Sequence, residues 1–222
     1  MKIGIVMPIG PGHDGYAALG MGLASSLVSR SNHSASRHEV WDTEGQLGRS
    51  KARNIGILEA QASGCAWILL IDADDRLISV PDLKANGDAI YTPSYVRYKN
   101  GRGRKVLHCA APESHWNWLV KNGPIRSLMM GNFYRAAALA GHLFREDLDH
   151  GEDWEHHLSF IAGHAWTIAP EPLVLADTTT PSAGGPRGGS KDWAKAAEPF
   201  FRFWRKRGRI PLTAEERATD YW

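Results

Sequence analysis

Three aspartates, Asp72, Asp74 and Asp75, lie within four residues, directly after the apolar run CAWILLI at residues 65–71. Carboxylates this close repel one another, and a cation or positively charged neighbours usually compensate for that repulsion. Mg²⁺ and Mn²⁺ are typically held by one or two carboxylates together with substrate phosphates. The cluster therefore indicates a divalent metal site, and a solvated acidic turn is the alternative interpretation.

The elements that position these aspartates alternate between strands and helices. Short apolar runs predict strands over residues 2–9, 38–41 and 65–71. Asp14 and Ser50 are the expected caps of the two helices between them, and Gly64 is the expected end of the second helix. Their predicted buried faces are Tyr16, Leu19, Leu23 and Leu27 on the first helix, and Ile55, Leu58 and Ala62 on the second. This alternation predicts an open α/β sheet, whose ligands bind beyond the carboxyl ends of the strands.

The pattern is weaker in the rest of the chain. A hairpin is predicted from the runs 89–98 and 105–110, with Asn100 and Gly101 in its turn. Further strands are expected over 127–132 and 173–177. Further helices are expected over 114–121, 134–140 and 152–162, and a basic, aromatic helix over 191–208. Residues 178–190 contain four Gly and two Pro, which is typical of a loop.

The acidic pair Glu152 and Asp153 stands at the predicted start of the helix over 152–162. The helix dipole favours carboxylates there, so a purely structural role is one interpretation. Trp154 could stack on a sugar or a base, or simply pack. His156 and His157 are adjacent and point in different directions on a helix, so we expect packing and solvation rather than a metal site.

Two segments together resemble family 2 glycosyltransferases of the GT-A fold. The first is GRSKARNIGILEAQASGCAWILLIDADD, in which an Ala-Arg-Asn helix precedes a strand that ends in Asp-x-Asp. The second is GNFYRAAALAGHLFREDLDHGEDWEHHLSF, which resembles the acceptor half of that family. The resemblance implies a GT-A type, Rossmann-like, mostly parallel open sheet flanked by helices. It also implies a glycosyltransferase domain over 1–177, with a nucleotide-binding half at 1–76 and an acceptor half at 77–177; the loop 178–190 and a basic C-terminal helix and tail at 191–222 follow.

The same resemblance implies residues that bind the sugar donor. Asp42 matches the aspartate that reads the base, and a carboxylate accepts the N3–H of uracil, which favours a UDP-sugar. Arg53 and Asn54 match a pair near the nucleotide, and Pro8 ends the first strand. Without the resemblance, we would expect Arg53 to form a salt bridge on the surface.

The metal and catalytic residues implied by the resemblance are carboxylates. Asp74 is the expected Mn²⁺ or Mg²⁺ ligand, and Asp72 shares the ion or contacts the ribose. Many relatives have a histidine near the last sheet strand; here Asp177 stands near that place, and His164 is the alternative. Asp153, with Glu152 beside it, is the implied general base of an inverting transfer. Trp154 and Asn132 are the expected acceptor-binding residues.

The composition of the chain indicates its cellular compartment. It has 222 residues, a formal net charge of +2 and two cysteines, Cys65 and Cys109. We therefore expect a reduced, cytoplasmic protein, since two cysteines form neither a disulfide framework nor a four-cysteine zinc site. No apolar run approaches the roughly 20 residues of a membrane helix. The Gln-x-x-Arg-Trp motif of processive synthases is absent, which favours single transfers to a soluble acceptor.

Two basic segments suggest a nucleic-acid acceptor. Arg97 to Lys105 contains five basic residues in nine, and Arg202 to Arg209 ends the aromatic C-terminal helix. Basic patches beside aromatic rings suit phosphate backbones and exposed bases. A hydroxymethylated base in DNA is therefore the most specific acceptor hypothesis, and it requires both segments to form one positive surface near Asp153. The alternatives are a saccharide or protein acceptor, a sugar-phosphate nucleotidyltransferase, and a non-catalytic nucleic-acid-binding protein on a GT-A core. For the second segment, the plainest alternative is a C-terminal helix that packs its aromatics on the body and leaves its charges in water.

Overall fold

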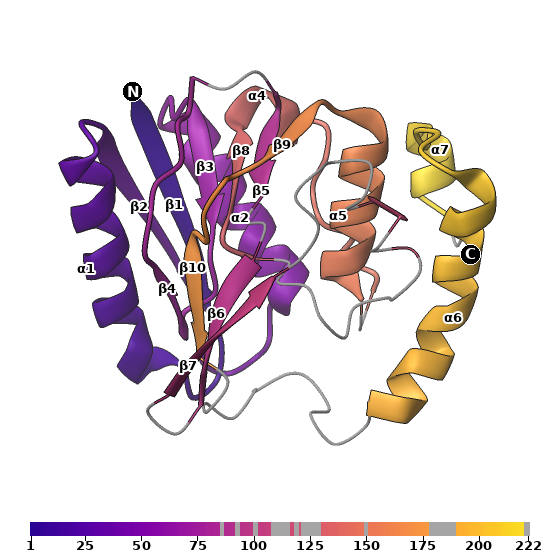
Figure 1. Ribbon diagram of the computed structural model, residues 1–222, viewed down its shortest axis with the longest axis horizontal. Coiled ribbons are helices and arrows are strands. Elements are labelled where there is room, and N and C mark those ends of the chain that lie inside the picture. The colour runs from indigo at the N-terminus through magenta and orange to yellow at the C-terminus, as the bar shows by residue number, and fades with distance from the viewer. Residues whose placement is uncertain are drawn as a thin grey trace.

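The computed structural model describes residues 1–84, 87–91, 94–99, 102–107, 116–117, 120, 130–148, 151–177 and 190–219. Strands and helices alternate along the N-terminal third, as expected (Figure 1). The strands are β1 (Lys2–Ile9), β2 (Ser34–Trp41), β3 (Trp67–Leu70), β4 (Asp75–Leu77), β5 (Ala89–Tyr91), β6 (Ser94–Lys99), β7 (Arg102–Leu107), β8 (Asn132–Arg135), β9 (Trp166–Ile168) and β10 (Val174–Asp177). The helices are α1 (Asp14–Arg30), α2 (Arg49–Ala62), α4 (Ala136–Leu139), α5 (Glu152–Gly163), α6 (Ser190–Arg207) and α7 (Ala214–Arg217).

The main sheet has six strands in the order β2-β1-β3-β8-β5-β9. β1 is parallel to β2 and β3, β5 is parallel to β9, and β8 runs antiparallel to both of its neighbours. Ile3, Ile5 and Met7 point to the face that α1 covers, whereas Val6 packs on the face shared by α2 and α5. This alternation follows from the two-residue period of a strand, and it confirms the open, mostly parallel sheet.

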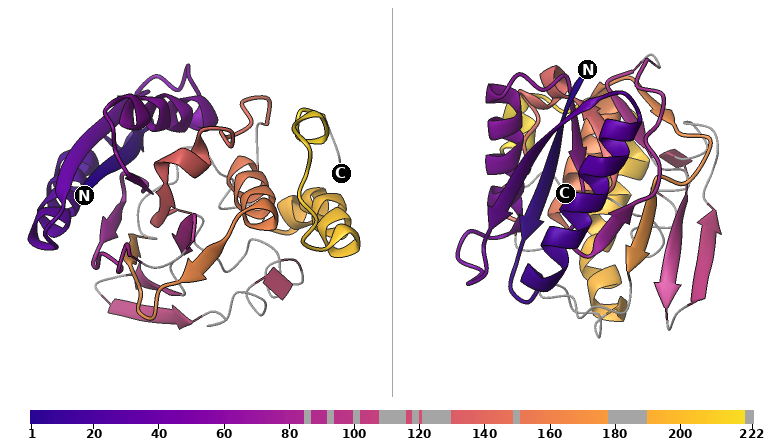
Figure 2. Two further views of the ribbon diagram at one scale, coloured as in Figure 1. Left: turned by 90° about the horizontal axis from the view of Figure 1, so that it is seen from above. Right: turned by 90° about the vertical axis from the view of Figure 1, so that its left-hand side faces the viewer.

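A second sheet of four strands, in the order β4-β10-β6-β7, carries the predicted hairpin. Lys99 pairs with Arg102, so β6 and β7 are joined by a two-residue connection; Asn100 and Gly101 themselves lie outside the described residues. The strand expected over 89–98 is divided between β5 in the main sheet and β6 in the second sheet. Figure 2 shows this second sheet as a separate layer beside the main one.

The predicted apolar face of α1 is wrong except at Leu27, which is partly buried and packs against the core. Tyr16, Leu19 and Leu23 are exposed by 36–53%, and the helix instead buries small residues together with Met21 and Val28. A Cβ on Gly20 would lie 3.2 Å from the carbonyl oxygen of Ala73. The helix therefore lies so close to the chain beyond β3 that only its face of small residues fits against the sheet. Asp14 is the first helical residue rather than a side-chain cap.

The predicted face of α2 is also wrong. Leu58 is 49% exposed, and the buried face carries Arg53, Asn54, Ile57 and Ala60. A Cβ on Gly56 would lie only 2.5 Å from Cγ1 of Val6, so this helix packs closely on β1. Gly48 precedes the helix and Ser50 lies inside its first turn, which corrects the predicted cap. The two polar residues on this face, Arg53 and Asn54, hydrogen-bond to groups from other parts of the chain.

The later elements differ from the prediction mainly in their bounds. The strand expected over 127–132 is β8, which starts at Asn132, and the helix expected over 134–140 is the shorter α4. α5 begins at Glu152 after Gly151, whose φ of 79° is the left-handed conformation that glycine adopts readily. Phe200, Phe201 and Trp204 of α6 join the same core as Trp154, so the aromatics of this helix pack on the body. Most of 114–121 and all but the last residue of 178–190 lie outside the described residues.

Candidate functional site

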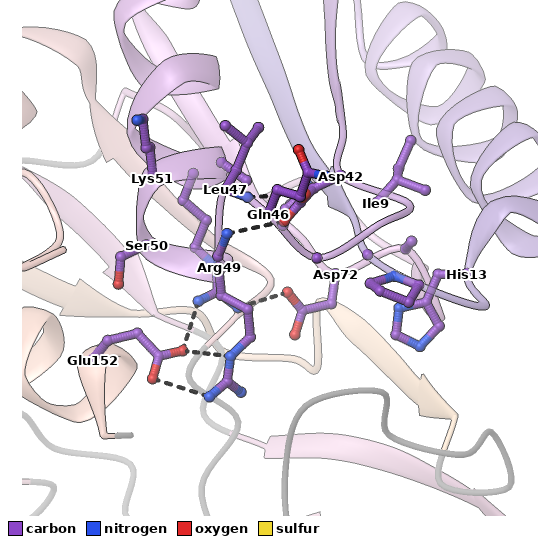
Figure 3. Close-up of a pocket in the computed structure, with 18 of the residues that line it drawn as sticks. Ile9, His13, Asp42, Gln46, Leu47, Arg49, Ser50, Lys51, Asp72 and Glu152 are labelled. Atoms are coloured by element: carbon purple, nitrogen blue, oxygen red, sulfur yellow. Dashed lines mark hydrogen bonds and ion pairs between the residues drawn. The ribbon is translucent and has the colours of Figure 1, made fainter. Parts of the chain in front are cut away.

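A cavity of about 510 Å³ opens at the carboxyl ends of β1, β2 and β3 (Figure 3). Its lining comes from the segment after β1, the loop after β2, the first turns of α2, the residues after β3, Glu146 and Leu148, and the start of α5. This is the edge at which open α/β sheets bind ligands. Of the residues predicted to bind a sugar donor or a metal, Pro8, Asp42, Arg53, Asp72 and Asp74 line this cavity.

Asp42 directly follows β2 and fixes the loop that comes after it. Its Oδ1 accepts the N–H of Leu47 at 3.0 Å, and its Oδ2 accepts the N–H of Gly48 at 2.9 Å. The carboxylate therefore sits at the N-terminus of α2, where the helix dipole favours a negative charge. Its orientation is set before any ligand binds.

Arg53 is the central cation of the site. Its side chain is 5% exposed; Nη2 donates to Oδ1 of Asp72 at 3.1 Å, and Nη1 donates to Oε1 of Glu152 at 3.0 Å. Burial alone lowers the pKa of a guanidinium, but the carboxylates of Asp72, Glu152 and Asp153 together raise the pKa of Arg53 above its ordinary value. A buried, bridging arginine replaces the exposed salt bridge expected from the sequence pattern alone.

The neighbours Glu152 and Asp153 have different environments. Glu152 is 2% exposed, and Arg49 contacts it in addition to Arg53, with Nε and Oε1 3.3 Å apart. Asp153 is half-buried, and its Oδ1 accepts the N–H of Trp154 at 2.8 Å. Burial and the adjacent negative charge of Glu152 raise the pKa of Asp153 to about 7. Glu152 is thus held in ion pairs, whereas Asp153 can exchange a proton near neutral pH.

Three residues that line the cavity carry buried polar atoms without a hydrogen-bond partner in the described part of the chain. These atoms are Nε2 of His13, Oγ of Ser50 and Nε of Arg53. Buried polar groups in native proteins nearly always have a partner, and a bound ligand can supply one. His13, Ser50, Arg49 and Lys51 were not predicted as site residues; their positions directly after β1 and in the first turn of the Ala-Arg-Asn helix are the signal that could have indicated them.

The contacts of Asn54, Trp154 and Asn132 do not match the ligand-binding roles predicted for them. The amide of Asn54 donates to the carbonyl of Phe144 and to Glu146, both at 2.9 Å, and accepts the N–H of Phe144 at 2.8 Å, so it ties α2 to the segment before α5. Trp154 is 4% exposed, with its ring 5.5 Å from that of Phe201, which is the packing alternative. Asn132 is 1% exposed and pairs with Leu70 at the end of β3. None of the three lines the cavity in the described part of the chain.

The candidate metal ligands lie at the same edge. Asp72 and Asp74 both line the cavity, and Asp75, 5% exposed, begins β4. Ala176 of β10 pairs with Asp75, and the next residue, Asp177, pairs with Tyr98 of β6; the side chain of Asp177 lies outside the described part. Among the described residues no group of three His, Cys, Asp or Glu side chains could hold an ion by itself. Two carboxylates fit an ion that completes its coordination with phosphate oxygens and water.

His164, the other suggested ligand, lies at the opposite end of α5 from Glu152. Its Nδ1 is 3.1 Å from the carbonyl oxygen of Phe160, and its ring stacks on that phenyl ring at 4.1 Å. This position argues against His164 as a ligand of an ion at Asp72 and Asp74.

The basic C-terminal residues make contacts within the protein. Arg205 donates to the carbonyl of Val120 at 2.9 Å and pairs with Glu198, and Arg207 pairs with Glu216 at 2.9 Å. Arg209 lies over the ring of Trp166, which follows the end of α5 far from Asp153. The β6–β7 hairpin and α6 also occupy separate parts of the molecule (Figures 1 and 2). These positions do not support the single positive surface that the DNA hypothesis requires.

No protein-family model matches this chain, and no curated protein matches it significantly. Among solved structures, it is similar to the catalytic domain of Drosophila β1,4-galactosyltransferase 7 in complex with xylobiose, with a TM-score of 0.50 and 12% sequence identity. The match covers 76% of this chain and 65% of that one, so this chain spans less than two thirds of that structure's length. At this identity the likeness shows the fold: a mixed α/β domain of GT-A type. In the described residues no helix is long and apolar enough to cross a membrane.

Proposed function

We propose that this protein is an inverting glycosyltransferase that moves a sugar from a UDP-sugar to an acceptor hydroxyl. The observation that carries the proposal is the Arg53 bridge. It joins Asp72, after β3, to Glu152, beside Asp153, at the rim of one cavity in a GT-A type fold. A carboxylate for the donor side and a carboxylate for the acceptor side are thereby brought together, although they are far apart in the sequence.

The sugar donor binds in the cavity beyond β1, β2 and β3. Asp42 is already oriented by two backbone N–H groups and keeps lone pairs that can accept the N3–H of uracil. Pro8 and the loop after β2 form the walls beside it, and the unpartnered atoms of His13 and Ser50 offer further hydrogen bonds to the nucleoside. Asn54 supports this wall from behind rather than contacting the nucleotide.

Asp74 and Asp72 are the residues that would hold a divalent cation with the diphosphate. Such an ion, Mn²⁺ or Mg²⁺, neutralises the charge that develops on a leaving phosphate. Arg53 keeps one oxygen of Asp72 fixed at 3.1 Å, so that this carboxylate is oriented toward the cavity by its partner. Asp177, the last residue of β10, is the proposed third ligand.

Asp153 acts on the acceptor. It removes the proton of the acceptor hydroxyl while that oxygen forms a bond to the anomeric carbon, and the bond from that carbon to the diphosphate oxygen breaks on the opposite face. A single displacement of this kind inverts the anomeric centre. A pKa of about 7 suits this role, because a base titrating near the working pH is largely ionised yet still basic enough to take a proton.

The acceptor is proposed only as a hydroxyl compound. The ion pairs of α6 weaken the case for DNA, and a saccharide or protein hydroxyl fits the described surface without requiring that helix to bind phosphates. The nucleotidyltransferase alternative has little support, because the segment from Gly10 to His13 has no lysine or arginine that could serve as its basic residue.

Incubation with a panel of nucleotide sugars and Mn²⁺ tests the proposal. We expect release of UDP from one UDP-sugar even without an acceptor, with other bases turned over more slowly. Titration calorimetry of UDP with and without Mn²⁺ measures donor binding separately. The absence of both UDP release and UDP binding would contradict the proposal.

A further inference from the structure

Glu152 and Glu155 are three residues apart in α5, so their side chains lie one above the other on the same face of the helix. Both are buried, with exposed fractions of 2% and 0%. Arginines from α2 hold the first of them, and an arginine from the C-terminal segment holds the second. Asp153 stands between these two anchors.

Arg217 of α7 provides the second anchor. Its Nε and Nη2 each donate to one carboxylate oxygen of Glu155 at 2.9 Å, the bidentate geometry that is strongest for this pair. Nη2 also donates to the carbonyl of Leu143 at 2.6 Å. One side chain near the C-terminus therefore fixes both α5 and the segment from which Glu146 and Leu148 reach the cavity wall.

The C-terminal segment is itself held rigidly. Thr213 and Glu216 form a reciprocal capping box at the start of α7, and Arg207 makes two hydrogen bonds of 2.9 Å to the carboxylate of Glu216. Arg145 donates to the carbonyl of Thr219 at 2.8 Å. α7 follows the end of α6 in space (Figure 1), so residues 207–219 form a strap from α6 across to α5.

We propose that Arg217 is a positioning residue for Asp153, and that the C-terminal strap is therefore part of the machinery for transfer. This inference rests on the proposed function of Asp153. Without the guanidinium, the carboxylate of Glu155 loses two charge-assisted hydrogen bonds in a fully buried place, which is costly. The first turn of α5 relaxes as a result, and Asp153 leaves the geometry required to take a proton. The nucleoside part of the cavity is built on β1, β2 and α2 and stays intact.

The test compares Arg217→Gln with Arg217→Lys and with Arg202→Gln. Arg202 is a matched control, because its side chain is 63% exposed and its ion pair is loose, with Nε 3.9 Å from Oε1 of Glu198 on α6. For Arg217→Gln we expect UDP release to slow about tenfold to a hundredfold, the loss typical of a catalytic group displaced by about 1 Å. The affinity for UDP and Mn²⁺ should change by less than about threefold, since donor and base are bound by different elements. Lysine should restore part of the rate, because it keeps the charge but not the fork of two donors.

Hydrogen exchange gives a readout that needs no substrate. Amides 153–157 should exchange faster in Arg217→Gln than in the parent or in Arg202→Gln, while those of β1 and β3 stay protected. If Arg217→Gln folds poorly, Glu155→Gln removes the buried charge as well as the bidentate pair and should show the same pattern. The inference is overturned if the rate falls no more than in the control, if UDP affinity falls as much as the rate, or if exchange at 153–157 is unchanged. An inactive parent protein that does not bind UDP would instead count against the proposed function, with the exchange pattern still deciding whether the strap holds this turn.

Discussion

Arg53 and Glu152 are 99 residues apart in the chain, and Nη1 of the arginine lies 3.0 Å from Oε1 of the glutamate in the interior of the protein. This pair ties α2 to the first residue of α5. Since the same guanidinium also binds Asp72, a single side chain connects the end of β3 to α5.

Replacing Arg53 with Gln should lower the free energy of unfolding by about 3–5 kcal/mol, because it leaves a buried carboxylate without its main cation. Urea denaturation measures the loss. Arg49→Gln is the control: the side chain of Arg49 is 43% exposed and also contacts Glu152. That variant should cost at most about 1 kcal/mol, as exposed ion pairs do. Equal losses in the two variants would contradict the central role of Arg53.

Asp74→Asn should abolish metal-dependent UDP binding, because the amide keeps the shape of the side chain but removes the charge that faces a cation. Calorimetry of UDP with and without Mn²⁺ measures this. Asp82→Asn is a suitable control, since Asp82 is exposed and does not line the cavity. An unchanged effect of Mn²⁺ in Asp74→Asn would remove this residue from the metal site.

Asp153→Asn should leave UDP affinity nearly unchanged and reduce turnover at least about a hundredfold, within the range that general-base catalysis contributes. The exposed Asp14, changed to Asn, controls for the loss of one negative charge. Near-normal turnover in Asp153→Asn would place the base elsewhere, with Glu152 the first residue to examine.

The pH dependence of turnover should show the ionisation of Asp153. With its pKa raised to about 7, the carboxyl is protonated and inactive as a base below that pH, so the rate should rise through pH 7 and then level off. A pH–rate profile of the parent enzyme measures this step. A rate already at its maximum at pH 5 would contradict it.

The same shift has a consequence for stability. The folded state holds the proton of Asp153 more tightly than the unfolded chain, so the free energy of unfolding falls as pH rises from 3.8 to about 7. In Asp153→Asn the side chain does not titrate, so the free energy of unfolding does not fall for this reason. Its stability relative to the parent should therefore increase from pH 4 to pH 8 in urea titrations.

The close packing of α2 on β1 can be tested with a pair of glycines. Gly56→Ala would place a Cβ 2.5 Å from Val6, and overpacking of this kind costs about 1–3 kcal/mol. Gly22 lies in α1, and a Cβ added there would meet nothing within 4 Å, so Gly22→Ala should gain up to about 1 kcal/mol from helix propensity. The midpoint of thermal unfolding should be lower than that of the parent for Gly56→Ala and higher for Gly22→Ala. Shifts of the same sign in both variants would contradict the packing argument.

The sequence by itself determined the order of the first strands and helices and the edge of the sheet at which the site lies. Continuous apolar runs such as residues 65–71 predict buried parallel strands, and the aspartates that follow them must then lie at the carboxyl edge. Asp42 follows β2, Asp72 and Asp74 follow β3, and all three line one cavity. Hydrophobic runs and turn residues act over a few positions, so they can be recognised without knowing what packs against them.

Only the tertiary structure decided which faces are buried and which charges pair. The apolar stripe of α1 is exposed because small residues are needed where the helix approaches the sheet, and helical periodicity alone does not contain that distance. Arg53 binds Asp72 and Glu152, and Arg217 binds Glu155, because elements from three regions of the chain meet at α5. Each of these pairs depends on distances between residues far apart in sequence. For that reason the sequence indicated a group of carboxylates, and the fold determined that arginines hold Glu152 and Glu155, whereas burial and the charge of Glu152 raise the pKa of Asp153.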